Sequence, residues 1–150
     1  MLRSQRLEVV LKLEEQREQQ ALEKMAEAQR AHEAQRQQID NLERYQQEYR
    51  DQIRANQQGV VAVSRLQAWQ AFIAQLDQVI VQQQTVLQQA RAGLDAAREV
   101  WQKAWERRRG MEKYIETCRR QEQQESDARE QKLADEAASR IYNRRRESDR

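Results

Sequence analysis

Seam-forming residues recur at alternating steps of three and four from Leu66 to Cys118 without a slip. Steps of this kind place one stripe along a helix and are typical of a coiled coil. No proline occurs in the chain, and its only glycines are Gly59, Gly93 and Gly110, so nothing in this stretch forces a helix to end. The series is Leu66, Trp69, Ile73, Leu76, Ile80, Gln83, Leu87, Ala90, Leu94, Ala97, Trp101, Ala104, Arg108, Met111, Ile115 and Cys118.

The first part of the chain follows the same rule with a more polar series. It begins at Leu7 and ends at Ile53, and its middle holds histidine and glutamine. A polar seam still predicts a helix that pairs with a partner helix, because polar seam residues can fix the register. The series is Leu7, Leu11, Glu14, Glu18, Ala21, Met25, Ala28, His32, Gln35, Ile39, Leu42, Gln46, Tyr49 and Ile53.

The two series lose their common phase across residues 54–65, RANQQGVVAVSR. Gly59 is the only glycine near mid-chain that could adopt a left-handed turn, so we expect a turn at about 57–63. Ser64 is then the expected N-cap of the second helix. The alternative is one uninterrupted helix, since a single interior glycine costs only about 1 kcal/mol.

A turn at this place predicts an all-α fold, a two-stranded antiparallel coiled-coil hairpin with a longer second helix. The expected helices cover about 4–56 and about 64–140 of a single coiled-coil domain, residues 1–150, with a C-terminal tail that frays unless it docks. Hydrophobic residues make up only 38% of the chain, which supplies a narrow seam but not a layered core.

Charge and cysteine content narrow the class of protein. Charged residues make up 35% of the chain, with 27 basic against 25 acidic side chains and a net charge of +2, as expected for solvated helix faces. Cys118 is the only cysteine, and the N-terminus lacks the apolar core of a secretory signal. Apolar runs such as 60–63 and 79–81 are too short to span a bilayer. A reducing, cytoplasmic setting is expected.

The sequence holds no recognisable catalytic or cofactor-binding pattern. Neither a Walker-type nor a dinucleotide-binding glycine motif occurs, and His32 is the only histidine. A metal site would need further ligands near it, so His32 is interpreted as a polar seam residue and Cys118 as a small hydrophobic one. We therefore expect no enzyme activity, no cofactor and no metal.

Arginines cluster at 107–109, 119–120 and 144–146, which raises nucleic-acid binding as an alternative. Acidic residues interrupt these clusters and would repel a polyanion. The pattern favours surface ion pairs, and we expect no nucleic-acid partner. The interrupting residues are Glu106, Glu112, Glu116, Glu122, Glu125, Asp127 and Glu130.

Aromatic residues form two short stripes on either side of the expected turn. A fold-back near residue 60 predicts that Tyr49 lies opposite Phe72, Tyr45 opposite Leu76, and Leu42 opposite Val79. Tyr45 and Phe72 lie off the strict seam positions, and a two-helix structure has no third layer to cover them. The patch either extends the local core or docks a partner protein.

The sequence resembles the FliJ family, small coiled-coil proteins of the bacterial flagellar type III export apparatus, over nearly its full length. Trp69 stands where a tyrosine is more usual in the family. The resemblance is carried by an Arg-x-x-Arg-Leu start at Arg3, Arg6 and Leu7, by Tyr45, Tyr49, Gly59, Leu66, Trp69, Phe72, Ile73, Leu76, Ile80, Gln84, Leu87, Arg98 and Trp101, and by Asp135, Glu136 and Ala137.

This resemblance implies a fold similar to the stalk subunit of rotary ATPases, with the end that bears the termini inserted into the export ATPase hexamer. It also implies contact with the cytoplasmic domain of the export gate protein and with export chaperones, so that the chain meets the inner membrane only indirectly. Carried over by position, the gate-contact surface is Gln38, Leu42, Tyr45, Tyr49, Phe72, Leu76, Val79 and Gln83.

The free end of the hairpin is the expected ring-contact region. The N-terminal segment offers Arg3, Arg6 and Leu7, and the overhanging second helix offers a thin apolar stripe. Contact of these arginines and of Arg140 with acidic loops of a ring is a hypothesis from charge. A stalk protein of virulence type III secretion and a generic coiled-coil scaffold are the alternatives. The stripe consists of Leu133, Ala137 and Ile141.

Overall fold

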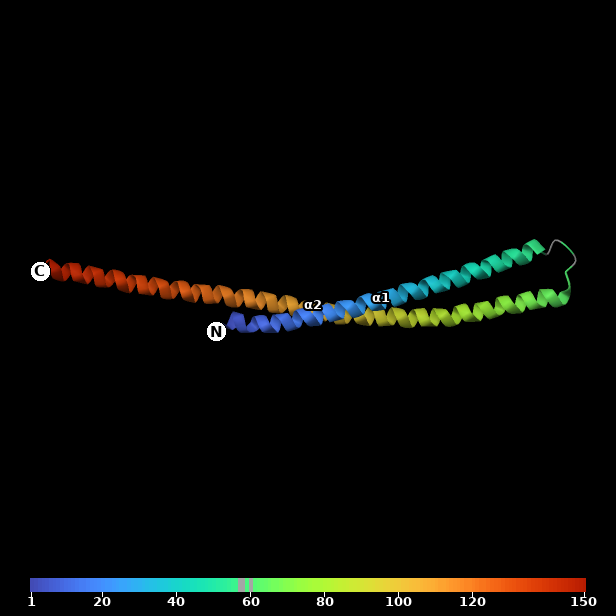
Figure 1. The fold of residues 1–150 in the computed structure, drawn as a ribbon, viewed down its shortest axis with the longest axis horizontal. Helices are drawn as coiled ribbons and strands as arrows, with labels where there is room; N and C mark the ends of the chain where they lie inside the picture. Colours follow the sequence, from blue (N-terminus) through green and yellow to red (C-terminus); the bar gives the residue numbers. More distant parts are fainter. Residues whose placement is uncertain (57–58, 60) are drawn as a thin grey trace. The chain divides into compact units, whose positions relative to one another are not determined.

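The computed structural model describes residues 1–56, 59 and 61–150. In these residues it contains two α-helices, α1 (Arg3–Asn56) and α2 (Val63–Ser148), and no strand. The helices have 54 and 86 residues and run side by side in opposite directions (Figure 1). The predicted all-α hairpin with a longer second helix is confirmed.

Helix α1 begins with a side-chain cap. Gln5 accepts a hydrogen bond from the backbone N–H of Leu2 at 3.3 Å, and the Leu2 carbonyl accepts one from the N–H of Arg6 at 3.2 Å. These contacts satisfy backbone groups that the first turn of a helix leaves free. At the other end, Arg54 places a positive charge in the last turn, which complements the helix dipole.

The start of α2 differs from the expected one. The Ala62 carbonyl accepts hydrogen bonds from the N–H groups of Arg65 and Leu66, so the helix begins at Val63 and Ser64 lies inside its first turn. The prediction of Ser64 as the N-cap is therefore wrong. The expected turn at about 57–63 includes residues 57, 58 and 60, which lie outside the described residues.

Two further details concern glycine and the C-terminus. No glycine within the described residues has a positive φ, so the left-handed conformation expected at Gly59 is not found. Helix α2 continues to Ser148, past the expected end near residue 140. Arg145 and Arg146 lie in its last turn, where basic side chains stabilise a helix end.

The chain divides into two compact units. Unit 1 consists of Met1–Glu18 and Ala104–Arg150, and unit 2 consists of Gln19–Lys103. Each unit pairs a segment of α1 with a segment of α2. In unit 1 the C-terminal part of α2 continues beyond the N-terminus of α1 (Figure 1). All residues from 127 to 150 are exposed.

A narrow seam forms the core of both units. Every residue of the two predicted seam series is buried or half-buried, and none is exposed. The burial is nevertheless shallow, because in the described part of the chain no large side chain has a relative exposure below 2%. The most deeply buried apolar residues are Ala21, Ile39, Ile80, Leu94, Ile115 and Cys118. Among the described residues, no helix is both long and apolar enough to cross a membrane.

Candidate functional site

An aromatic cluster lies at the connection end of unit 2. The rings of Tyr49 and Phe72 have centroids 4.6 Å apart at an interplanar angle of 64°, and those of Tyr45 and Phe72 have centroids 6.5 Å apart at 84°. Both are edge-to-face arrangements, which the ring quadrupoles favour. Tyr49 thus lies opposite Phe72 as predicted, whereas the pairing of Tyr45 with Leu76 stays a prediction.

The eight residues expected to contact an export gate all lie in unit 2, at two heptad positions. We label the seven heptad positions a to g, with Ile39 and Ile80 at position a, so that a and d form the seam. Four of the eight residues occupy position d, and the other four occupy the neighbouring position g. The d residues are half-buried, and among the g residues Tyr45 is 50% and Val79 is 39% exposed. The d residues are Leu42, Tyr49, Leu76 and Gln83, and the g residues are Gln38, Tyr45, Phe72 and Val79.

The g residues belong to a longer surface without charge. In an antiparallel pair the g positions of both helices lie on the same side of the seam, as the Tyr45–Phe72 contact shows, and positions c lie next to them. All but the half-buried Phe72 are exposed. We call this surface the uncharged flank; it consists of Ala31, Ala34, Gln38, Asn41 and Tyr45 of α1 with Ala68, Phe72, Gln75, Val79, Gln82, Val86, Gln89, Gly93, Ala96 and Val100 of α2.

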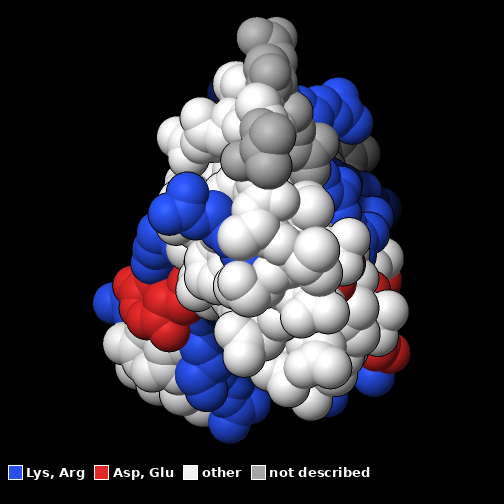
Figure 2. Space-filling view, turned by 90° about the vertical axis from the view of Figure 1, so that its right-hand side faces the viewer, with Lys and Arg blue, Asp and Glu red and all other residues white. Residues whose placement is uncertain are grey.

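The other side of the seam in unit 2, at positions e and b, carries many charges. Arg50 and Asp77 approach across the two helices at 3.9 Å, and Arg91 and Asp95 pair along α2 at 3.3 Å. Seen from the end near the connection, uncharged side chains fill the middle of the view and charged ones lie towards its edges (Figure 2). We call this second surface the charged flank; its charged members are Glu33, Arg36, Asp40, Glu43, Arg50, Arg54, Asp77, Arg91, Asp95 and Arg98.

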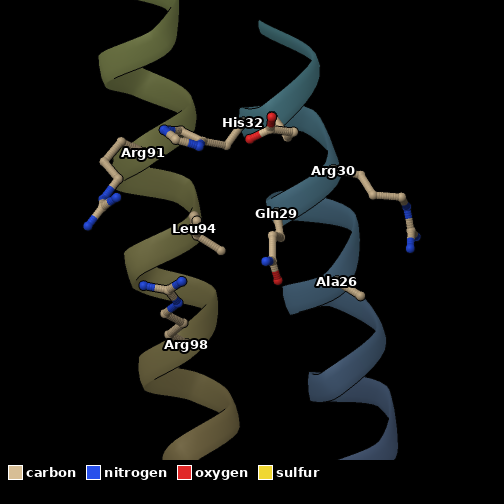
Figure 3. Close-up of a pocket in the computed structure, with 8 residues that line it drawn as sticks. Ala26, Gln29, Arg30, His32, Arg91, Leu94 and Arg98 are labelled. Carbon is tan, nitrogen blue, oxygen red and sulfur yellow. The ribbon is translucent and has the colours of Figure 1, made fainter. Parts of the chain in front are cut away.

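An open hollow of about 500 Å³ lies on the charged flank. His32 and Leu94 reach into the space between the helices, whereas Arg30 points away (Figure 3). Arg91 and Arg98 border the hollow from α2. The described residues contain no group of three or more His, Cys, Asp or Glu side chains that could hold a metal ion, and this hollow offers none.

Two polar contacts cross the seam of unit 2. Gln46 is 7% exposed, and its Nε2 donates hydrogen bonds to Oδ1 of Asp77 at 2.6 Å and to the carbonyl of Ile73 at 3.3 Å. Gln35 Nε2 likewise donates to the side chain of Gln83 at 2.6 Å. A one-turn slip of either helix would break these bonds in a partly dry environment, so they help to fix the register.

The N-terminus of α1 is held by a carboxylate from α2. Glu122 accepts hydrogen bonds from the Ser4 hydroxyl at 2.6 Å and from the Ser4 backbone N–H at 3.0 Å. The side-chain bond and then the backbone bond lower the pKa of Glu122 below its ordinary value of 4.5, and Arg119 acts in the same direction. The carboxylate also lies at the positive end of the α1 dipole. Ser4 is itself buried, at 4% exposure.

A second polar cluster lies further along unit 1. Arg108 forms ion pairs with Glu18 across the seam and with Glu112 one turn along α2, the latter at 2.7 Å. The hydrogen bonds to Glu18 and then to Glu112 raise the pKa of Arg108 still further above its ordinary range. The seam of unit 1 therefore contains an ion pair at Arg108, whereas the contacts described in the seam of unit 2 are formed by apolar and amide side chains.

The expected ring-contact residues all lie in unit 1 but form two separate groups. Arg3 lies over the ring of Tyr114, 5.3 Å from its centroid, and Leu7 is half-buried in the seam. Leu133 and Ile141 are 65% and 55% exposed on the part of α2 beyond the end of α1. Because Ser4 meets Glu122, the stripe begins about 16 Å further along α2. Arg6 and Ala137 are exposed.

The contact between Ser4 and Glu122 could have been found from the sequence. A step of three back from Leu7 reaches Ser4, and a step of four on from Cys118 reaches Glu122, so the first series continues by one position at its start and the second by one position at its end. The Gln46–Asp77 bond was not predicted, because Asp77 lies outside the seam positions. The only sequence signal for this bond is that a polar residue, Gln46, occupies a seam position, where it needs a hydrogen-bond partner once it is buried.

Cys118 is buried at 4% exposure, and the hollow in unit 2 is open. No curated protein and no solved structure gives a significant match to the chain. The profile of the family described as "FliJ: Flagellar FliJ protein" matches residues 3–147. The chain therefore belongs to the FliJ family, a family of flagellar, export-associated coiled-coil proteins.

Proposed function

We propose that this chain is a cytoplasmic adaptor of the flagellar export apparatus that binds the export gate protein, the export ATPase hexamer and export chaperones. In this proposal the aromatic cluster and its neighbours contact the cytoplasmic domain of the gate protein. The exposed part of α2 in unit 1 contacts the ATPase ring. The chain reaches the inner membrane only through the gate protein.

The observation that carries the gate contact is the aromatic cluster of exposed Tyr45 with half-buried Tyr49 and Phe72. Half of the Tyr45 side-chain surface remains accessible although its ring packs against Phe72. An aromatic ring held in a fixed orientation loses little side-chain entropy when it is covered, and such residues are frequent hot spots of protein interfaces.

The ring contact is supported by the C-terminal part of α2. Leu133 and Ile141 expose apolar side chains on one side of the helix, and no residue from 127 to 150 is covered by α1. Arg140 and the arginines at 144–146 add positive charge there. This combination fits a partner surface that offers apolar and acidic side chains together.

Gate binding is tested by titrating the cognate gate cytoplasmic domain into the full chain. Tyr45→Ala combined with Phe72→Ala should lower the affinity about tenfold or more, because both remove area from the expected centre of the interface. Unchanged affinity would remove the gate contact from the proposal. Tyr142→Ala is the control, since Tyr142 is exposed in unit 1.

Ring binding is tested by the ATP hydrolysis rate and hexamer fraction of the cognate export ATPase. We expect stimulation by the full chain and its loss with Leu133→Glu plus Ile141→Glu. The control, Ala128→Glu plus Ser139→Glu, adds the same charge on the opposite side of the same helix. Equal stimulation by both variants would place the ring contact elsewhere. Substitutions are preferable to removing α2 after Cys118, which would also remove Glu122 from Ser4.

A further inference from the structure

The uncharged flank continues far beyond the aromatic cluster. Along α2, position g holds Phe72, Val79, Val86, Gly93 and Val100, each seven residues from the next. The three valines are 39%, 43% and 57% exposed. The three valine side chains lie beside the seam rather than in it, so the two helices leave them exposed.

The absence of charge on this flank is selective. Charged residues make up 35% of the chain, yet none occurs at positions c and g of α2 from Ala68 to Val100. On α1 these positions are uncharged from Ala31 to Tyr45, and the nearest charges at c and g lie outside this stretch, at Lys24, Glu27 and Glu48. The charged flank of the same unit carries charges at the same levels, for example at Arg91. The fold of the free chain does not need exposed valines, because uncovered apolar area brings no stability.

We propose that the uncharged flank binds one amphipathic α-helix of the partner protein, which lies along the flank from the aromatic cluster to Val100. This inference rests on the proposed gate contact and identifies the element that makes it. From Phe72 to Val100 the flank extends about 42 Å, which a helix of about 28 residues would cover. The contact face of that helix carries apolar and uncharged polar side chains.

Two features select a helix as the occupant. The exposed apolar residues recur every seven residues, and a third helix that packs along a coiled coil contacts the same heptad position at this interval. At Gly93 an added Cβ would meet no atom within 4 Å, so a partner backbone can approach closely there. Gln82 and Gln89 lie between the apolar positions and offer amide groups to uncharged polar partners.

A second copy of the chain fits this surface less well. Lys24 occupies position g of α1, and the hollow that joins Ala26 to Arg98 places it near the level of Val100. A twofold pairing of two such flanks would bring Lys24 against its own counterpart or against the aromatic cluster. Either arrangement removes an ammonium group from water without a partner, which is unfavourable. A single partner helix meets Lys24 only once, at its end near Val100, where the ammonium group can stay in contact with water.

The first test compares lysine substitutions on the two flanks, with the cytoplasmic domain of the cognate gate protein as the probe. Val86→Lys plus Val100→Lys in the full chain should lower the affinity about tenfold or more. Val81→Lys is the control, because Val81 is 61% exposed on the same helix but at position b of the charged flank. Its affinity should stay within about twofold of the parent, and the helical circular dichroism should be the same for all.

The second test uses glycine. Gly93→Leu should raise the midpoint temperature of the free chain by about 2–4 °C, because it removes a helix-weakening glycine where the side chain has room. The same change should weaken gate binding, since a side chain now separates the two backbones. Gly110→Leu, at the other open helical glycine, should raise the midpoint without changing the affinity.

The outcomes separate this inference from the function on which it rests. If Tyr45→Ala weakens binding while the Val86 and Val100 substitutions and Gly93→Leu do not, the helix-binding flank is wrong and the gate contact stands. If neither set weakens binding, both proposals are wrong. If the lysine substitutions change the sedimentation of the chain alone to a smaller species, the flank pairs with a second copy and the inference is overturned.

Discussion

The two flanks of unit 2 are built on the same helices at the same levels, yet they differ in charge. The charged flank carries alternating acids and bases that pair along and across the helices, such as Arg50 with Asp77. The uncharged flank carries valine, alanine, glutamine, Gly93 and two aromatic rings. Between them lies one seam, where Leu94 is only 2% exposed.

This difference shows that the residues that stabilise the folded chain, in the seam, are not the residues that are available to a partner, on the uncharged flank. Exposed ion pairs contribute little to stability, and exposed valines contribute even less, so the seam must supply most of the stability of the folded unit. The charged flank keeps one side solvated. The uncharged flank remains a surface whose apolar area can be buried only by another molecule.

The largest expected effect comes from the seam itself. Leu94→Ala should lower the free energy of unfolding by about 2–5 kcal/mol, because it opens a cavity at a residue that is 2% exposed. Val100→Ala, at a residue that is 57% exposed on the uncharged flank, should change it by less than about 0.5 kcal/mol. Urea denaturation measures both. Equal losses would mean that the uncharged flank is already packed in the free chain and contributes to its stability as the seam does.

The next effect concerns the contact between the seam and the charged flank. Gln46→Ala should cost about 1–3 kcal/mol, since it removes buried hydrogen bonds to Asp77 and to the backbone of Ile73. Gln47→Ala is the matched control, because the Gln47 amide is exposed and bonds only Asp51 one turn away. Its loss should stay below about 0.5 kcal/mol in the same denaturation experiment. A result in which both substitutions cost the same would show that burial at position 46 does not matter.

A smaller effect of opposite sign is expected on the uncharged flank. Gly93→Ala should stabilise the chain by about 1 kcal/mol, because alanine favours the helix and its Cβ meets nothing within 4 Å. Thermal unfolding followed by circular dichroism measures the change. A loss of stability at Gly93, beside a gain with Gly110→Ala, would reveal that another surface already covers Gly93 in the free protein.

The smallest effect tests how much charge contributes in the seam of unit 1. The pKa of Glu122 is lowered in the folded chain by its bonds to Ser4, so its stabilising contribution is complete above pH 4.5 and is lost as the pH falls through the lowered pKa. Glu122→Gln should therefore flatten the dependence of stability on pH in this acidic range. Unfolding measured from about pH 7 to about pH 3 checks this, with Glu125→Gln as an exposed control. An identical pH profile for Glu122→Gln and the parent would argue against the contact.

Most of the fold could be predicted from the sequence, because the packing of a coiled coil depends on one periodic series of seam residues. Every predicted seam residue, including polar ones such as Glu14 and Gln83, is buried or half-buried. Helix ends were harder, because they depend on single backbone hydrogen bonds. The carbonyl of Ala62 accepts the first backbone hydrogen bonds of α2, and no residue type in the sequence signals this position. The prediction of Ser64 as the N-cap was therefore wrong.

The candidate surface was predicted only in part. The meeting of Tyr49 and Phe72 followed from the position of the fold-back, and the structure confirms it. The extent of the uncharged flank was not predicted from the sequence. Val86 and Val100 lie outside the seam series, and their common position beside the seam is recognised only when the two helices are aligned. The bond from Gln46 to Asp77 likewise joins a seam position to a flank position, which periodicity alone does not connect.

Binding by the uncharged flank is tested most directly by calorimetric titration of the cognate gate cytoplasmic domain into two variants of the full chain, Val79→Lys and Val81→Lys. These valines are two residues apart on α2, are 39% and 61% exposed, and lie on opposite flanks. Val79→Lys should lower the affinity about tenfold or more, whereas Val81→Lys should leave it within about twofold of the parent. Equal affinities for the two variants, or a loss confined to Val81→Lys, would contradict the assignment of the uncharged flank as the binding surface.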